Sequence, residues 1–215
     1  HLFKNYGINS LDDKKINRSE LLKMCGLEAS DETMVIGMVG RLTSQKGLDL
    51  VQCVLNDILE KDVRMIVLGT GDYDYEQMFM RAKWEHPDKI STNIMFSADL
   101  ANKIYAGCDL FLMPSLFEPC GLAQMIAMRY GTLPLVRETG GLKDTVQPYN
   151  QFTGEGTGFS FANYNAHEML HVIEKAAALF RHDQKAWRQM QCNAMNRDFS
   201  WDRSAQAYID LYQGI

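Results

Sequence analysis

Short apolar runs alternate along most of the chain with segments in which apolar residues recur every three or four positions. Runs of continuous apolar residues are typical of strands buried in a parallel sheet, whereas the three- and four-residue spacing is typical of helices. Strands are predicted over 34–39, 64–68, 93–96, 109–113, 133–136 and 158–161. Helices are predicted over 18–25, 49–59, 75–83, 100–106 and 119–130.

This alternation of strand and helix predicts an α/β fold, with a Rossmann-like parallel sheet and helices on both faces. Right-handed crossovers place the carboxyl ends of all strands at one edge, where ligands of such sheets bind. From about residue 165 the strands stop, and three helices are predicted over 166–180, 183–196 and 200–212, with Ser200 as the N-cap of the last. We therefore expect one domain, 1–215, with a helical tail over about 165–215.

Composition narrows the classes of function. The net charge of −5 argues against nucleic acid as a partner, because binding to a phosphate backbone needs a basic face. The chain lacks a run of 18 apolar residues, so we expect no membrane span. The chain begins at His1 rather than Met, which suggests a piece of a longer protein.

The cysteines and histidines give no sign of a metal site. Five cysteines are scattered without a CxxC pair, which argues against zinc and favours a reducing compartment, the cytoplasm. His167 and His171 have the four-residue spacing of metal ligands on a helix, but the sequence offers no third ligand. We expect neither a metal nor a cofactor.

The loop after the first predicted strand carries two cations between two glycines. Arg41 and Lys46 lie between Gly40 and Gly47. Glycine allows a ligand to approach the backbone, and guanidinium and ammonium groups both bind phosphate oxygens. The pattern indicates a diphosphate site, although two solvated surface cations would give the same sequence.

A second group follows the strand predicted over 109–113. Glu118 stands before Pro119, which is well placed in the first turn of a helix whose free N–H groups would point to the carboxyl edge. Glu118 either caps this helix or accepts hydrogen bonds from sugar hydroxyls, and the pattern leaves both open. For Cys120, packing is the favoured role.

Two glycine pairs follow other strands. Gly140 and Gly141, after Thr139, are either an anion cradle or an ordinary turn. Gly69 and Gly71 lack the third glycine of a dinucleotide fingerprint, so a tight turn is favoured over a phosphate site.

Taken together, these segments resemble one family. Residues 39–50 (VGRLTSQKGLDL) resemble the arginine–lysine loop of bacterial glycogen synthases and plant starch synthases. Residues 114–122 (PSLFEPCGL) and 128–142 (MRYGTLPLVRETGGL) are similar to the signature segment of that family, and 198–201 (DFSW) is similar to the start of its closing helix.

The resemblance implies the C-terminal, donor-binding half of a GT-B glycosyltransferase. Such an enzyme transfers glucose from ADP-glucose to the non-reducing end of an α-1,4-glucan, retains the anomeric configuration and needs no metal. The glucan acceptor would bind through an N-terminal domain outside this chain, so we expect the isolated domain to be inactive.

The resemblance also assigns roles to residues. Arg41 and Lys46 would neutralise the diphosphate, and Glu118 would hold sugar hydroxyls. Phe96 would lie beside the adenine. The remaining substrate-binding residues are expected to contact donor oxygens or the phosphate side, chiefly through the backbone: Gly40, Cys120, Gly121, Leu122, Thr139, Gly140 and Gly141.

Two alternatives remain. A sibling transferase could use a UDP-sugar, but many such relatives carry a second glutamate eight residues after the first, and here that position is Ile126. A non-catalytic, phosphate-sensing α/β module would be of another class. A response-regulator type of module needs an acidic pocket, which Arg41 and Lys46 argue against.

Overall fold

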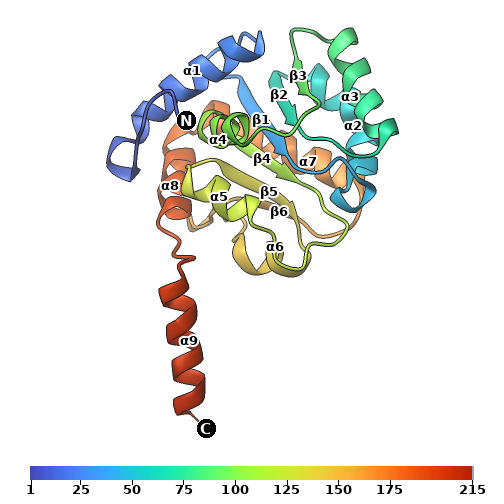
Figure 1. Ribbon diagram of the computed structural model, residues 1–215. Helices are drawn as coiled ribbons and strands as arrows, with labels where there is room; N and C mark the ends of the chain where they lie inside the picture. Colours follow the sequence, from blue (N-terminus) through green and yellow to red (C-terminus); the bar gives the residue numbers. More distant parts are fainter. Residues whose placement is uncertain (215) are drawn as a thin grey trace.

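The computed structural model describes residues 1–214 and shows a six-stranded sheet in which every strand pairs in parallel (Figure 1). The strand order is β3-β2-β1-β4-β5-β6, so the chain winds outward in both directions from its first strand, as the alternating pattern predicts. The strands are β1 (Met34–Val39), β2 (Val63–Leu68), β3 (Ile90–Asn93), β4 (Leu110–Met113), β5 (Leu133–Arg137) and β6 (Phe159–Phe161).

Helices connect the strands and follow the last one. They are η1 (Ile8–Asp13), α1 (Lys14–Cys25), η2 (Ser44–Lys46), α2 (Leu48–Glu60), α3 (Tyr73–Glu85), α4 (Ala98–Gly107), α5 (Ala123–Arg129), α6 (Gly140–Thr145), α7 (Ala166–His182), α8 (Gln184–Met195) and α9 (Trp201–Gln213), where η marks 3-10 helix.

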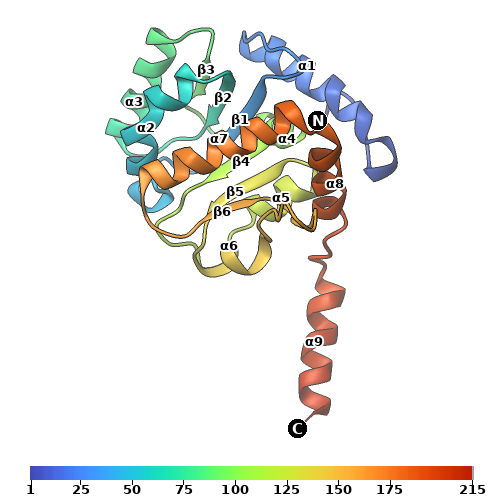
Figure 2. The same cartoon turned by 180° about the vertical axis from the view of Figure 1, so that it is seen from behind.

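Helices cover both faces of the sheet. Helix α4 packs on β1 and β2, α5 packs on β4 and β5, and α1 lies over α4. Seen from behind, α7 runs across the opposite face, where it contacts β1, β5 and β6 beside α2 (Figure 2). The apolar stripes of these helices are buried against the apolar strands, which confirms the predicted three-layer fold.

Two predicted elements have wrong boundaries. Helix α5 begins at Ala123 rather than at residue 119, because Gly121 takes a left-handed conformation (φ 73°) that a helix cannot contain. Strand β3 spans Ile90–Asn93 and shares only Asn93 with the strand predicted over 93–96. Its partner β2 ends opposite it at Leu68, so the ladder of hydrogen bonds stops there.

A buried charged cluster fastens α1 to the amino ends of the strands. The Asp109 carboxylate accepts hydrogen bonds from Arg18 Nε (3.1 Å) and from the N–H of Val35 (2.8 Å). Lys14 Nζ donates to Thr132 Oγ1 at 2.7 Å. Burial lowers the pKa of the Lys14 ammonium to about 8 and raises the pKa of the Asp109 carboxyl, which Arg18 opposes. These contacts lie at the edge of the sheet opposite the carboxyl ends.

Helix α9 extends away from the sheet and buries none of its side chains (Figure 1). Ser200 caps it as predicted, since its Oγ accepts from the N–H of Arg203. Large apolar side chains lie exposed along it, among them Trp201 and Tyr212. Within residues 1–214, no helix combines the length and the apolar character that a membrane span requires. The predicted domain boundary at Ile215 lies outside the described residues.

We expect Arg18→Met to lower the free energy of unfolding by about 3 kcal/mol, because the buried Asp109 carboxylate would lose its cation. Arg188→Met is the matched control, since Arg188 pairs with Asp12 at the surface, where such pairs contribute about 1 kcal/mol or less. Urea unfolding followed by circular dichroism measures both changes. Equal losses of unfolding free energy in the two variants would show that the buried Arg18–Asp109 pair stabilises the protein no more than a surface pair does.

Candidate functional site

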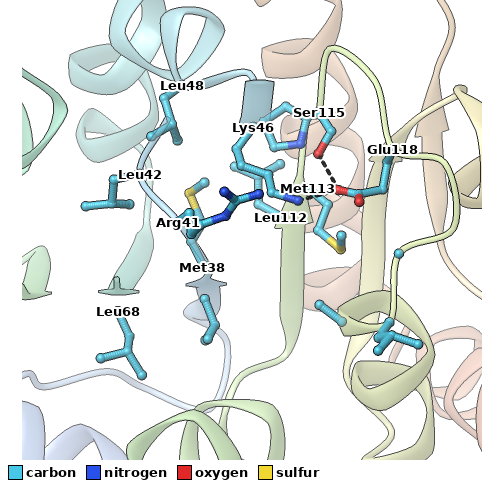
Figure 3. A pocket seen from close by; sticks show the side chains of 16 residues that line it. Met38, Arg41, Leu42, Lys46, Leu48, Leu68, Leu112, Met113, Ser115 and Glu118 are labelled. Atoms are coloured by element: carbon cyan, nitrogen blue, oxygen red, sulfur yellow. Dashed lines mark hydrogen bonds and ion pairs between the residues drawn. The ribbon is translucent and has the colours of Figure 1, made fainter. Parts of the chain in front are cut away.

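A hollow of about 240 Å³ opens at the carboxyl edge of the sheet, between the loops that follow β1 and β4 (Figure 3). We call it the central hollow. Its floor is formed by apolar side chains at the strand ends, such as Met38 and Met113. Its polar and loop residues are Gly40, Arg41, Lys46, Ser115, Glu118, Gly121 and Leu122. Six of the predicted site residues, Lys46 and Glu118 among them, therefore meet in one place.

An ion pair joins the two loops across the central hollow. Lys46 Nζ lies 2.5 Å from Glu118 Oε2, and the Ser115 hydroxyl donates to the same oxygen at 3.3 Å (Figure 3). Glu118 does not cap α5, whose N-cap is Leu122, so the capping alternative is wrong. The Glu118 carboxylate is instead held by Lys46, and its side chain is only 11% exposed.

Arg41 extends toward the same side of the central hollow (Figure 3). Its residue is exposed to solvent, and no ion pair to it is found within residues 1–214. Two cations and one carboxylate leave one net positive charge at the central hollow. The arrangement therefore favours an anionic ligand.

The two loops approach each other so closely that a side chain would not fit. Gly47 has a φ of 71°, and a Cβ atom built on it would lie 2.0 Å from the carbonyl oxygen of Pro114. The N–H of Leu116 donates to the carbonyl of Gln45 at 2.9 Å. Glycine at position 47 is thus required both by the left-handed backbone and by the contact that places Lys46 beside Glu118.

The loop before α5 presents backbone donors. Cys120 and Gly121 precede the helix rather than forming its first turn, so the prediction that Pro119 begins the helix is wrong. The buried Gln124 amide donates to the carbonyls of Cys120 (3.2 Å) and Gly121 (2.9 Å) and so fixes the loop from below. In the described part of the chain, the N–H groups of residues 120–122 have no acceptor and can serve a ligand. Gly121 and Leu122 line the central hollow, whereas Cys120 does not.

The paired glycines after β5 lie behind this loop. The N–H of Gly141 donates to the carbonyl of Glu118 at 3.1 Å, and a Cβ atom on Gly141 would lie 2.0 Å from the carbonyl oxygen of Cys120. Thr139 is the N-cap residue of α6. Thr139, Gly140 and Gly141 therefore support the loop and do not line the central hollow. Their role at the phosphate side of a ligand remains a prediction.

A second hollow, of about 370 Å³, adjoins the first on the side of β2 and α4. We call it the outer hollow. Phe96 projects at its rim with 92% of its surface exposed, beside Met95. Gly40 and Arg41 line both hollows and so lie where the two adjoin. Gly69 lines the outer hollow and packs against the carbonyl of Gly40 in a tight turn.

Comparison with known proteins identifies the family. Residues 26–194 match the family described as "Glycosyl transferases group 1". The chain belongs to this family. It is 53% identical over 214 residues to the glycogen synthase of Clostridium acetobutylicum, covering 100% of this chain and 45% of that protein. It is 54% identical over 212 residues to the glycogen synthase of Clostridium beijerinckii, covering 99% and 44%.

A solved structure agrees with these relatives. The catalytic domain of starch synthase IV from Arabidopsis thaliana, bound to ADP and acarbose, superimposes with a TM-score of 0.90 at 32% identity, covering 99% of this chain and 44% of that one. This group 1 glycosyl transferase chain therefore spans a little under half the length of the relatives that it matches.

Some residues of the candidate site were missed in the sequence. Ser115, which is 1% exposed, donates to Glu118 and could have been found from its place directly after β4. Gln124 was missed because its partners are backbone carbonyls that leave no pattern in the sequence. Arg137, at the end of β5, has no role assigned from the sequence, yet it donates to the carbonyl of Ser115 at 2.9 Å.

We expect Gly47→Ala to lower the free energy of unfolding by about 2 kcal/mol or more, because the new Cβ atom would clash with Pro114 and strain the backbone. Gly7→Ala is the control, since Gly7 has open space around it and an extended backbone (φ −146°). Urea unfolding midpoints compare the two variants. An unchanged midpoint in Gly47→Ala would contradict the close approach of the loops.

Proposed function

We propose that this chain is the donor-binding domain, residues 1–215, of an enzyme that transfers glucose from ADP-glucose to the non-reducing end of an α-1,4-glucan with retention of configuration. The observation that carries this proposal is the Lys46–Glu118 pair, set beside Arg41 where two hollows adjoin at the carboxyl edge. The relatives named glycogen synthase, and the starch synthase structure with bound ADP, support it.

The diphosphate belongs at the junction of the two hollows. Arg41 lines both of them, and Lys46 lies in the central one. As the bond between the glucose and the diphosphate breaks, negative charge grows on the departing ADP. Cations that are already in place stabilise that charge without reorganising.

The glucosyl group belongs in the central hollow. The Glu118 carboxylate accepts hydrogen bonds from hydroxyl groups, and the N–H groups of Gly121 and Leu122 donate to sugar or phosphate oxygens. Lys46 has three N–H donors, of which Glu118 takes one. The same ammonium can therefore contact Glu118 and the diphosphate at once.

The adenine belongs in the outer hollow. Phe96 and Met95 provide an apolar surface there, on which a purine ring can lie. Ile126, where many UDP-sugar transferases have a glutamate, lines neither hollow. We therefore propose that the outer hollow binds the base of an adenine nucleotide rather than that of a uridine nucleotide.

The acceptor glucan belongs to the part of the enzyme that this chain does not cover. The chain spans about 45% of its relatives, and α9 has no partner within residues 1–214. We therefore expect donor binding without turnover from this chain by itself.

The five cysteines are free thiols, which supports a reducing compartment such as the cytoplasm.

Calorimetric titration tests the proposal. We expect ADP and ADP-glucose to bind and UDP-glucose to bind at least about tenfold more weakly.

Arg41→Met and Lys46→Met should each weaken ADP binding by about tenfold or more, because each removes a charged partner of the diphosphate. Lys23→Met, which removes the same charge from the exposed face of α1, is the control. Unchanged ADP affinity in both site variants would refute the diphosphate site, and preference for UDP-glucose would identify a sibling transferase.

Glu118→Gln separates the sugar from the nucleotide. The variant should bind ADP as tightly as the wild type or more tightly, because it removes a negative charge near the diphosphate and releases Lys46. Its affinity for ADP-glucose should fall by about fivefold or more, because an acceptor of sugar hydroxyls is lost. Titration of both ligands against both proteins gives the comparison. Equal weakening of ADP and ADP-glucose would show that Glu118 acts by holding the loop.

A further inference from the structure

Arg137 lies behind the loop that carries Glu118 and outside both hollows. Its Nε donates to the carbonyl of Ser115 at 2.9 Å, and its Nη2 donates to the carbonyl of Leu116. One planar guanidinium therefore fixes two consecutive peptide groups, two and three residues before Glu118. These two donors point at the backbone rather than toward a ligand.

Tyr164 holds the guanidinium from its face. The Arg137 carbon Cζ lies 5.5 Å from the centre of the Tyr164 ring, within the range of a cation–π contact. The Tyr164 hydroxyl donates to the Asp49 carboxylate in the first turn of α2. Burial and this bond raise the pKa of the Tyr164 phenol, so it remains a neutral donor at physiological pH.

These contacts close a ring around the site. Asp49 lies three residues after Lys46, and Leu116, which Arg137 holds by its carbonyl, donates its own N–H to Gln45 at 2.9 Å. The ring runs from the start of α2 through Tyr164 and Arg137 to the Glu118 loop, and returns through Gln45 to the Lys46 loop. Both residues of the Lys46–Glu118 pair are thus attached to the same ring of contacts, which we call the frame.

Taking the proposed function as the role of the site, we propose that Arg137 and Tyr164 are positioning residues that set the separation of the Lys46 and Glu118 loops. They touch neither hollow, and they act on the donor through the backbone of residues 115–116 and the first turn of α2. Lysine cannot replace Arg137, because an ammonium lacks the planar fork that spans two carbonyls and the flat face that stacks on Tyr164.

Amide hydrogen exchange without ligand tests the frame directly. The Leu116 N–H is protected by Gln45, so Arg137→Lys should raise its exchange rate by about tenfold, and Tyr164→Phe should raise it in the same direction. The matched controls are Arg181→Lys at the end of α7, where Arg181 pairs with Asp62, and Tyr208→Phe on the exposed α9. Exchange at Leu116 equal to that of the controls would overturn the proposal.

ADP titration shows whether the frame acts through Lys46. Arg137→Lys should weaken ADP binding by about tenfold in the wild type and by less than about twofold in the Lys46→Met background. Fully additive losses would overturn the proposal, because Arg137 would then act independently of Lys46. If the unaltered chain bound no ADP, the proposed function would fail, while the exchange rates would still decide the positioning role.

Discussion

The site depends on one backbone contact, the approach of Gly47 to the carbonyl of Pro114. It brings together two loops that are about 70 residues apart in the chain but follow the neighbouring strands β1 and β4. Parallel pairing delivers both loops to the same edge, and the missing side chain lets them touch. Only at that separation does Lys46 reach Glu118 at 2.5 Å. The ion pair therefore depends on sheet topology and on this glycine contact, together with the contacts of Arg137 and Tyr164 that hold the two loops, and it is not a cause of the fold.

The opposite edge of the sheet has a different task. There the charged groups are buried and satisfied within the chain, with Arg18 on Asp109 and Lys14 on Thr132. Such groups leave little capacity for a ligand. At the carboxyl edge, Arg41 is exposed and N–H groups of the loop before α5 have no acceptor among the described residues. Charges that are satisfied within the chain at the amino edge, and exposed donors at the carboxyl edge, therefore favour the carboxyl edge as the side that binds a ligand.

Most of the fold can be predicted from local patterns in the sequence, whereas the site can be predicted from them only in part. The apolar runs and helical spacing predicted most strands and helices of the sheet layers, because burial on a sheet face imposes a period on the sequence. Strand β3 was placed three residues too late, and the short helix α6 was not predicted. The start of α5 was mispredicted, because the left-handed Gly121 overrides the preference of Pro119 for a first turn. Arg41, Lys46 and Glu118 were predicted as site residues from loop position and family resemblance. The bond from Lys46 to Glu118, and the bonds of Arg137 to backbone carbonyls, are set by distant segments and have no local signature.

Under the proposed function, the arrangement would couple the two halves of a nucleotide-sugar. Glu118 is the acid nearest to Lys46, and its side chain is largely shielded from water, so its negative charge must be balanced within the site. A diphosphate that contacts Lys46 draws on the same positive charge that balances Glu118. Sugar hydroxyls that donate to Glu118 relieve this competition, because they take over part of the stabilisation of the carboxylate. A complete nucleotide-sugar therefore satisfies both partners of the pair, whereas a bare diphosphate leaves Glu118 to compete for Lys46. Under the proposed function, one ion pair would in this way let the site distinguish a donor from its nucleotide product.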